Sequence, residues 1–363
     1  MLKIQRKTVS LGLGLALVVT SGLSAAGQWQ ALPEQPPIPA DNPQSPAKVE
    51  LGKTLYFDPR FSGEGNISCN SCHNVMAGGD DSRPTSIGMH GVRGGRNSPT
   101  VWNAAFLSVQ FWDGRAPTLE EQAKGPVVNP IEMGMADLDA AMSRLRAIPG
   151  YEPMFEAAFP EDEQPVTANN AAKAVAAFER TLITPNSPYD RFVQGEESAL
   201  TEQQQRGMNT FADVGCTSCH SGPNFSGPQL PMGTGFFQRF PLFPGSDYEA
   251  RYALLDDTGR QEVTGKSSDQ YMWRVPGLRN VALTAPYFHN GSVRTLDEAV
   301  RVMAKTQLNR ELDPAQVSDI VAFLNALTGE FPQITMPRLP PTPNSSVIPP
   351  DAQLGQIDPS VHP

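Results

Sequence analysis

The sequence contains few of the residues that build metal sites or disulfide frameworks: four cysteines and five histidines occur among 363 residues. Positive charge is also scarce, because 28 lysines and arginines stand against 38 aspartates and glutamates, a formal net charge of −10. This balance argues against nucleic acid or an anionic membrane surface as a partner. It is compatible with a basic or strongly dipolar protein partner.

Long hydrophobic runs are missing outside the N-terminus. The apolar run Val9–Val19 follows the basic residues Lys3, Arg6 and Lys7 and precedes the small residues Ser24-Ala25-Ala26. It is shorter than the roughly 20 residues that span a bilayer, so a cleaved signal peptide over residues 1–26 is favoured over a membrane anchor. We therefore expect an exported protein of the periplasm, with no membrane span after cleavage.

Alternating strand patterns are missing too, and 31 glycines with 35 prolines predict many ordered loops. The sequence predicts a mostly α fold with two domains and long loops. Its length suits two domains of ordinary size. The break Thr184-Pro185-Asn186-Ser187-Pro188 divides residues 27–185 from residues 186–332, and a proline-rich tail covers residues 333–363.

Capping signals predict several helices. Ser45 as N-cap and Pro46 start a helix that runs to about Tyr56. A second helix is expected over residues 168–182, with Val175, Phe178 and Leu182 on its apolar face. Capping boxes at Thr201/Gln204, Thr295/Glu298 and Asp313/Gln316 predict three more helices, and Gly329 is expected to stop the last one.

All four cysteines occur in two motifs with the same spacing, Cys69-Asn-Ser-Cys72-His73 and Cys216-Thr-Ser-Cys219-His220. A disulfide in each pair would leave the adjacent histidines unexplained. A zinc site would need more ligands than His90, His289 and His362 can supply. The spacing is typical of c-type haem attachment, in which two thiols bond the vinyl groups and the histidine ligates the iron. We predict two covalent haem c groups.

The residue opposite each histidine decides what each haem does. Met303 lies 83 residues after His220 on a predicted helix. A lone methionine at such a position is usually part of the core. As an iron ligand it would raise the potential of that haem and favour electron transfer.

Several longer motifs give the chain a specific resemblance to a known family. The stretches Gln110–Ala116, Glu121–Pro126, Leu278–Val281, Pro286–Gly291 and Ala299–Met303 resemble the bacterial dihaem cytochrome c peroxidases, and so does the final helix. The resemblance extends from about Lys48 to Leu339. It implies reduction of hydrogen peroxide to water with electrons from a small cytochrome c or copper protein, and it implies the family's usual homodimer.

The resemblance further implies that each domain is a cytochrome c-like haem domain, and it implies a role for each haem. His73 would be the proximal ligand of the N-terminal haem, where peroxide binds. His220 and Met303 would ligate the C-terminal haem, which receives electrons. Trp112 would lie between the two haems and assist electron transfer, although packing is the usual role of a tryptophan in such a loop.

Gln122 and Glu132 match the family's distal-pocket residues. Peroxide cleavage requires a group that takes a proton from one oxygen and returns it to the other, and a carboxyl suits this general acid–base step. Gln122 would hold the peroxide by hydrogen bonding. Without the resemblance, Glu132 would be read as a solvated surface carboxylate.

A calcium ion between the domains is also implied. Asn97, Thr284 and Pro286 match the positions that bind it, through the Asn side chain and two backbone carbonyls, and oxygen ligands suit a hard cation. His289 belongs to a motif typical of the family, and we expect it to be structural or interfacial rather than a ligand.

The chain departs from the family pattern at the distal histidine of the peroxidatic haem, which the family places sixteen residues after the proximal one. Ungapped counting puts Met89 there, whereas a shift of one residue gives His90-Gly91 and requires a deletion before Arg96. Three outcomes stay open: His90 binds the iron, Met89 binds it, or the site is open. His90 is favoured because imidazole is the better ligand for ferric iron.

Two other functions compete with the peroxidase reading. Enzymes of the related MauG type oxidise a partner protein, and those relatives carry tyrosine where this chain has Met303. A pure electron carrier would have both irons saturated, as would follow if Met89 is a permanent ligand.

Overall fold

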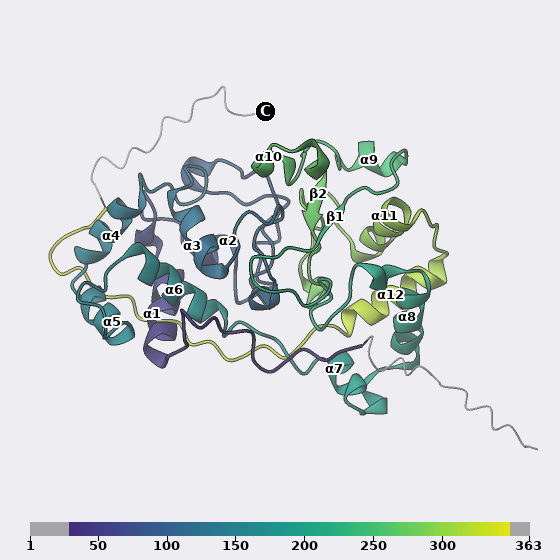
Figure 1. Cartoon of the computed structure of the whole chain (residues 1–363), viewed down its shortest axis with the longest axis horizontal. Coiled ribbons are helices and arrows are strands. Elements are labelled where there is room, and N and C mark those ends of the chain that lie inside the picture. The colour runs from purple at the N-terminus through teal and green to yellow at the C-terminus, as the bar shows by residue number, and fades with distance from the viewer. Residues whose placement is uncertain (1–28, 349–363) are drawn as a thin grey trace, which may run out of the picture.

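The computed structural model describes residues 29–348. The predicted signal peptide and the last part of the proline-rich tail therefore lie outside the described residues. The fold is mostly helical, as predicted, and long loops connect the helices (Figure 1). No helix among residues 29–348 is long and apolar enough to cross a membrane.

Helices of the N-terminal half enclose one large hydrophobic cluster that contains Leu51, Leu55, Tyr151 and Phe155, all of them fully buried. A one-turn helix, α2, carries the first cysteine motif. The bounds are α1 (Pro46–Phe57), α2 (Cys69–Cys72), α3 (Leu119–Val128), α4 (Leu138–Arg146), α5 (Tyr151–Ala158) and α6 (Ala168–Glu179).

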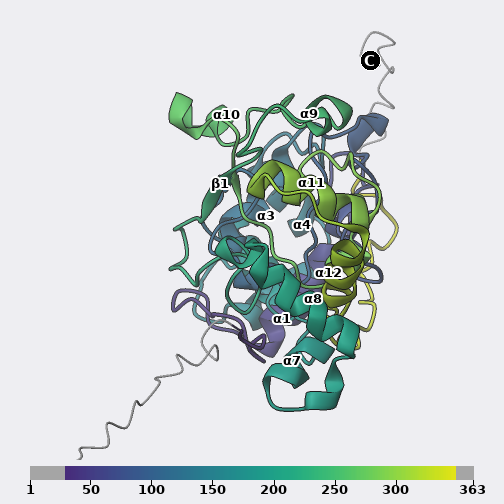
Figure 2. The ribbon, with the colours of Figure 1, turned by 90° about the vertical axis from the view of Figure 1, so that its right-hand side faces the viewer.

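The C-terminal half packs around a second cluster that includes Tyr189, Phe211, Phe225 and Phe323. Helices α8, α11 and α12 lie close together at this end of the molecule (Figure 2). The bounds are α7 (Pro188–Val193), α8 (Glu202–Asp213), α9 (Asp247–Arg251), α10 (Gln261–Thr264), α11 (Leu296–Leu308) and α12 (Pro314–Asn325). The strands β1 (Phe237–Arg239) and β2 (Met272–Arg274) pair antiparallel and are too short for an alternating pattern.

All five predicted helix starts are confirmed, and three of them have the predicted side-chain caps. The Ser45 hydroxyl accepts a hydrogen bond from the Lys48 backbone at 3.2 Å, and both partners of the capping boxes at Thr201/Gln204 and Asp313/Gln316 are present. These caps depend on residues within one turn, which explains why a local pattern predicts them.

Other local predictions were wrong. The capping box at Thr295 is not formed, because Glu298 instead accepts a hydrogen bond from the Tyr252 hydroxyl at 2.7 Å. Helix α6 ends at Glu179 rather than near residue 182. Helix α12 ends at Asn325, so Gly329 lies beyond it and does not cap it.

The two halves repeat the same helix packing. In the N-terminal half, a Cβ atom added to Gly52 of α1 would lie 1.8 Å from the carbonyl oxygen of Ala174 in α6. In the C-terminal half, a Cβ atom at Gly207 of α8 would lie 1.8 Å from the carbonyl oxygen of Asp319 in α12. Each pair of helices therefore approaches closely enough to require glycine at the crossing.

The loops repeat as well. Asn103 and Asn280 both have left-handed backbones and both donate a side-chain hydrogen bond to the buried Thr184 hydroxyl, at 2.8 and 2.9 Å. Nine residues after each asparagine stand Trp112 and His289, in bridged loops of the same form. This equivalence makes the two halves an internal repeat in structure, although the sequence shows it only weakly.

The two ends of the described chain cross between the halves. Trp29 packs on Tyr189 and Phe323 of the C-terminal cluster. The tail after α12 runs back along the N-terminal half (Figure 1), where the Pro340 carbonyl accepts a hydrogen bond from Arg60 at 2.8 Å. The predicted blocks 27–185 and 186–332 are thus held together by segments that lie outside their helical cores.

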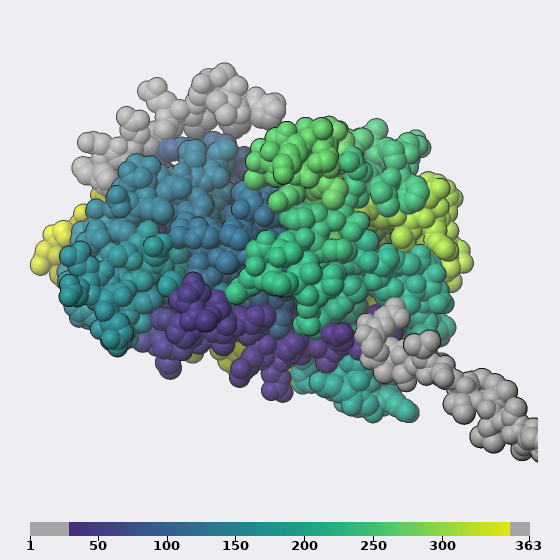
Figure 3. Space-filling model, in the orientation of Figure 1, coloured from purple at the N-terminus to yellow at the C-terminus, as the bar shows by residue number. Residues whose placement is uncertain are grey.

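Atoms of the two halves meet along a seam in the middle of the molecule (Figure 3). Arg96 crosses this seam to the Asp257 carboxylate with contacts of 2.6 and 2.8 Å. In return, Arg260 donates to the Asp113 carbonyl at 2.7 Å. These pairs fix the relative position of the loops that surround the functional residues.

Candidate functional site

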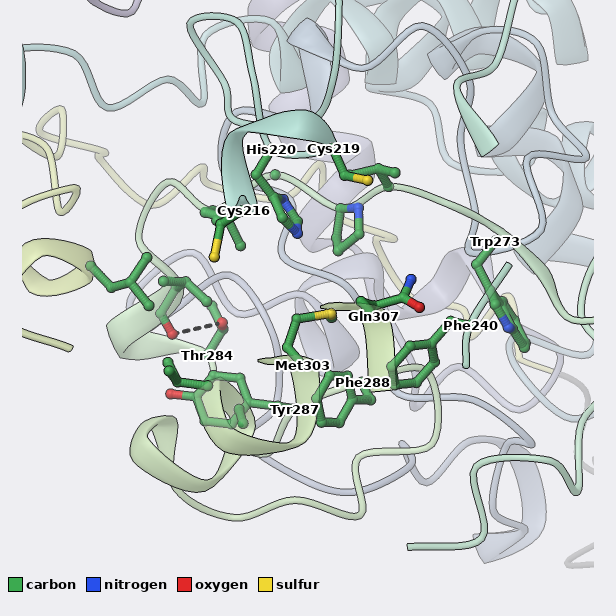
Figure 4. Close-up of a pocket in the computed structure, with 18 of the residues that line it drawn as sticks. Cys216, Cys219, His220, Phe240, Trp273, Thr284, Tyr287, Phe288, Met303 and Gln307 are labelled. Carbon is green, nitrogen blue, oxygen red and sulfur yellow. Dashed lines mark hydrogen bonds between the residues drawn. The ribbon is translucent and has the colours of Figure 1, made fainter. Parts of the chain in front are cut away.

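Each cysteine motif lies on the wall of its own cavity. Cys69, Cys72 and His73 line a cavity of about 670 Å³ that extends to the seam between the halves. Cys216, Cys219 and His220 line a second cavity of about 230 Å³. In the second cavity His220 and Met303 lie on facing walls (Figure 4).

The residues of both motifs fit covalent haem. All four cysteines are free, so neither pair forms a disulfide. Burial raises the pKa of Cys69 and Cys216 to about 12 in each case, which keeps these thiols neutral. No group of three or more His, Cys, Asp or Glu side chains within residues 29–348 could hold a bare metal ion, so a zinc site is not supported.

Both histidines are oriented by the same kind of bond. The Nδ1 atom of His73 donates to the Pro99 carbonyl at 2.9 Å, and that of His220 donates to the Phe225 carbonyl at 2.9 Å. Burial lowers the pKa of both imidazoles. A neutral ring with its proton on Nδ1 leaves Nε2 free to ligate iron, the arrangement expected of an oriented metal ligand.

Polar residues face the N-terminal cavity from the wall formed by α3 and the loop after it. Gln122 and Glu132 both line the cavity. The Glu132 carboxylate accepts a hydrogen bond from Asn129 at 2.8 Å. Burial raises the pKa of Glu132, against the opposing effects of Arg115 and Asn129. A carboxyl of raised pKa holds a proton more readily than an exposed one, which suits general acid–base chemistry.

Trp112 and His289, the equivalent residues of the repeat, line both cavities. The Trp112 indole donates to the Asn97 carbonyl at 2.9 Å. His289 is 2% exposed and stacks on Trp273 with centroids 4.2 Å apart. Burial lowers the pKa of His289 to about 4, so the ring is neutral at neutral pH. Both residues belong to the wall between the cavities.

Neither candidate of the glycine-rich loop lines the N-terminal cavity. Met89 is 2% exposed and packs against Gly63 and Gly134. The His90 side chain is 42% exposed, and its Nδ1 atom lies 2.9 Å from Glu64 Oε1. Of this loop, the structure brings Gly88, Gly94 and Gly95 to the cavity wall, and not Met89 or His90.

Asn97, Thr284 and Pro286 all line the C-terminal cavity. The Asn97 amide donates to the Arg83 and Pro84 carbonyls at 2.8 and 3.3 Å, which turns its side-chain oxygen away from them. Amide and carbonyl oxygens of this kind suit calcium.

Sequence reasoning missed Glu179, which lines the N-terminal cavity and is 6% exposed. A signal was present, because Glu179 follows Val175 by four residues and therefore lies on the apolar face of the predicted helix. A carboxyl group on a buried helical face is costly and calls for a functional or structural explanation, which the local sequence pattern does not provide.

Comparisons with known proteins place the chain in a family. The sequence profile of the di-haem cytochrome c peroxidases matches residues 46–198. The chain is 44% identical over 316 residues to the cytochrome c551 peroxidase of Pseudomonas aeruginosa, an alignment that covers 87% of this chain and 88% of that protein. The chain belongs to the di-haem cytochrome c peroxidase family. This membership confirms the resemblance, identifies the chain as an oxidoreductase and implies two haem c groups.

Relatives of the MauG type also match the chain. The methylamine utilization protein MauG of Methylorubrum extorquens is 36% identical over 319 residues, covering 85% of this chain and 86% of that protein. A solved MauG-like protein associated with microbial copper homeostasis is 32% identical with a TM-score of 0.72, covering 82% of this chain and 95% of that one. The di-haem architecture is therefore shared across both branches.

Proposed function

We propose that this protein reduces hydrogen peroxide to water in the periplasm with electrons from a small cytochrome c or cupredoxin. The observation that supports this most is the N-terminal cavity, where a haem-attachment motif, Gln122 and the raised-pKa carboxyl of Glu132 share one space. A bound haem supplies the redox-active iron. Glu132 moves a proton between the two peroxide oxygens, and Gln122 holds the peroxide by hydrogen bonding.

The C-terminal cavity serves electron entry. Cys216 and Cys219 would hold its haem covalently, and His220 and Met303 would ligate its iron. Histidine and methionine together raise a haem potential, which suits a centre that accepts electrons. Trp112 carries electrons onward, since it lies on the wall between the cavities.

The three oxygens of Asn97, Thr284 and Pro286 hold a calcium ion beside this wall. Asn97 also accepts the Trp112 indole hydrogen bond through its backbone carbonyl, at 2.9 Å. A cation on the Asn97 side chain would therefore fix the loop that positions Trp112. Calcium removal should weaken electron transfer between the haems more than it weakens haem attachment.

His90 remains our proposed distal ligand of the N-terminal haem in the oxidised protein. The support is its place in a loop with Gly88, Gly91, Gly94 and Gly95, which can move at low steric cost. The arrangement with His90 beside Glu64 would then be the state that admits peroxide.

The test is turnover of peroxide by the holoprotein with a reduced small cytochrome c or cupredoxin. Two donors oxidised per peroxide consumed would support the proposal. Peroxide consumption that leaves the donor reduced and oxidises an added partner protein instead would indicate an enzyme of the MauG type. Absence of turnover in a protein whose two haems both reduce would indicate an electron carrier.

A further inference from the structure

Glu179 is a carboxyl group in the N-terminal cavity for which residues 29–348 supply no hydrogen-bond or ion-pair partner. It ends α6, lines the cavity one turn after Val175 and is 6% exposed. Its Oε2 atom is fully buried, and no hydrogen-bond donor among residues 29–348 reaches it. An unpaired buried carboxylate is costly, so the group favours its protonated form.

The groups around Glu179 do not stabilise a negative charge. Its charge interacts with the side chains of Tyr56 in α1, Cys69 in α2, Glu120 in α3 and the adjacent Arg180. The Arg180 guanidinium donates hydrogen bonds to the Glu120 carboxylate at 2.7 and 3.2 Å, so it pairs with Glu120 and not with Glu179. The Tyr56 hydroxyl donates to the His73 carbonyl at 2.6 Å. Burial raises the pKa of Glu179 to about 8, with Glu120 adding to the rise and Arg180 opposing it.

The internal repeat shows that the fold does not require a carboxyl at this position. Ala174 and Asp319 are equivalent, because each carbonyl faces the crossing glycine of its half. Five residues further along stand Glu179 in α6 and Leu324 in α12. Leu324 lines the C-terminal cavity and is 4% exposed. The carboxyl therefore belongs to the chemistry of the N-terminal cavity and not to the helix packing.

Peroxide reduction has a proton demand that Glu132 alone does not meet. One hydrogen peroxide takes up two electrons and two protons to give two waters. Glu132 moves a proton from one peroxide oxygen to the other and returns to its starting state, a net supply of zero. Both consumed protons must therefore reach a largely apolar cavity from another group.

We propose that Glu179 is a proton-supplying residue of the N-terminal site, a role that rests on the proposed peroxide reduction. Its O–H bond breaks as an O–H bond of product water forms, directly or through an intervening water or Glu132. The carboxylate that remains takes a proton from solvent when the next electron, supplied by the reduced donor, reaches the site. Added negative charge in a medium of low dielectric disfavours a nearby carboxylate, so the proton follows the electron.

The experiment measures the potential of the N-terminal haem in the holoprotein as a function of pH, without peroxide. In the unmodified protein the potential should be flat near neutral pH and fall above about pH 8, by up to about 59 mV for a tenfold change in proton activity. Glu179→Gln and Glu179→Leu should both abolish this fall in potential, because neither side chain can titrate. The leucine variant reproduces the residue found at the equivalent position of the other half, Leu324. Glu179→Asp and Val175→Ala should keep the fall, because the first retains a carboxyl and the second changes only packing.

Peroxide turnover then tests the supply itself. Glu179→Gln should lower it roughly tenfold, less than the 10²–10⁴ typical of a group that acts directly. A fall in potential that persists in both Glu179→Gln and Glu179→Leu would overturn the proposal, and so would unchanged turnover. The unmodified protein could reduce no peroxide and still show a pH-dependent haem potential that requires Glu179. In that case the proposed peroxide reduction would be wrong, and the assignment of Glu179 as a proton-binding group coupled to the haem would be supported.

Discussion

The two cavities begin from the same motif and differ in the wall that faces it. In the C-terminal cavity, of about 230 Å³, a thioether from α11 faces the histidine of the motif. In the N-terminal cavity, of about 670 Å³, the other walls carry Gln122, Glu132 and Glu179. The attachment motif therefore determines which cofactor each cavity binds. The residues on the opposite wall determine the role of that cofactor: electron transfer in one cavity, and binding and protonation of a substrate in the other.

The sharpest way to break this comparison is to remove the acid–base group from the larger cavity. Glu132→Gln keeps the hydrogen-bonding size of the side chain and removes its proton acceptor. Peroxide turnover should fall by about 10²–10⁴, while both haems stay bound and reducible. Steady-state kinetics with a haem assay measures this, and unchanged turnover would refute the role of Glu132.

A second substitution tests the methionine that suits the C-terminal haem to electron transfer. Met303→His should keep the C-terminal iron six-coordinate and lower its potential by on the order of 0.1 V or more, within the range of roughly 0.8 V that axial ligands span. The reason is that a thioether favours ferrous iron more than imidazole does. A spectroelectrochemical titration gives the potential, and an unmoved value would return Met303 to the core.

The glycine-rich loop offers a smaller effect confined to the N-terminal haem. His90→Ala should convert that haem to a high-spin form in the oxidised protein and let peroxide react before reduction. Met89→Ala is the matched control, because Met89 is buried against Gly63 and Gly134. A low-spin signal that survives His90→Ala and is lost in Met89→Ala would assign the ligand to the methionine, and a high-spin haem in the unmodified protein would exclude both.

The smallest effect concerns the scaffold that the cavities share. Gly52→Ala and Gly207→Ala should each lower the free energy of unfolding by about 2 kcal/mol, because the added Cβ would clash with a backbone oxygen and the overpacking cost should lie at the upper end of its range. Overpacking costs about 1–3 kcal/mol, and the roughly 1 kcal/mol that alanine gains over glycine in a helix only partly offsets it. Thermal melts of the two variants should show similar losses, and a melt unchanged in one of them would show that its helix crossing is not constrained.

Local signals explain how much of this could be predicted from sequence. The starts of α1, α8 and α12 depend on caps within one turn, and the haem motifs depend on a spacing of a few residues, so both are visible in the chain. The failed cap at Thr295 depends on Tyr252, a residue 46 positions away from Glu298, which no local pattern reveals.

The same distinction applies to the sites. Family resemblance supplied Gln122, Glu132 and Trp112, and the structure brings all three to the N-terminal cavity. Glu179 was missed because its importance depends on the cavity and on its equivalence to Leu324, neither of which appears before the helices are packed. The equivalence of Trp112 and His289 was hidden for the same reason, since it rests on the backbone of two loops and not on shared residues.

The most direct test of the contrast between the cavities is the amount of carbon monoxide bound by the fully reduced holoprotein with both haems in place. A haem with histidine and methionine ligands has no free position, whereas a haem facing an open cavity has one. The account predicts one carbon monoxide for every two haems, with Met303→Gly raising the number to two. Two bound by the unmodified protein, or none, would contradict it.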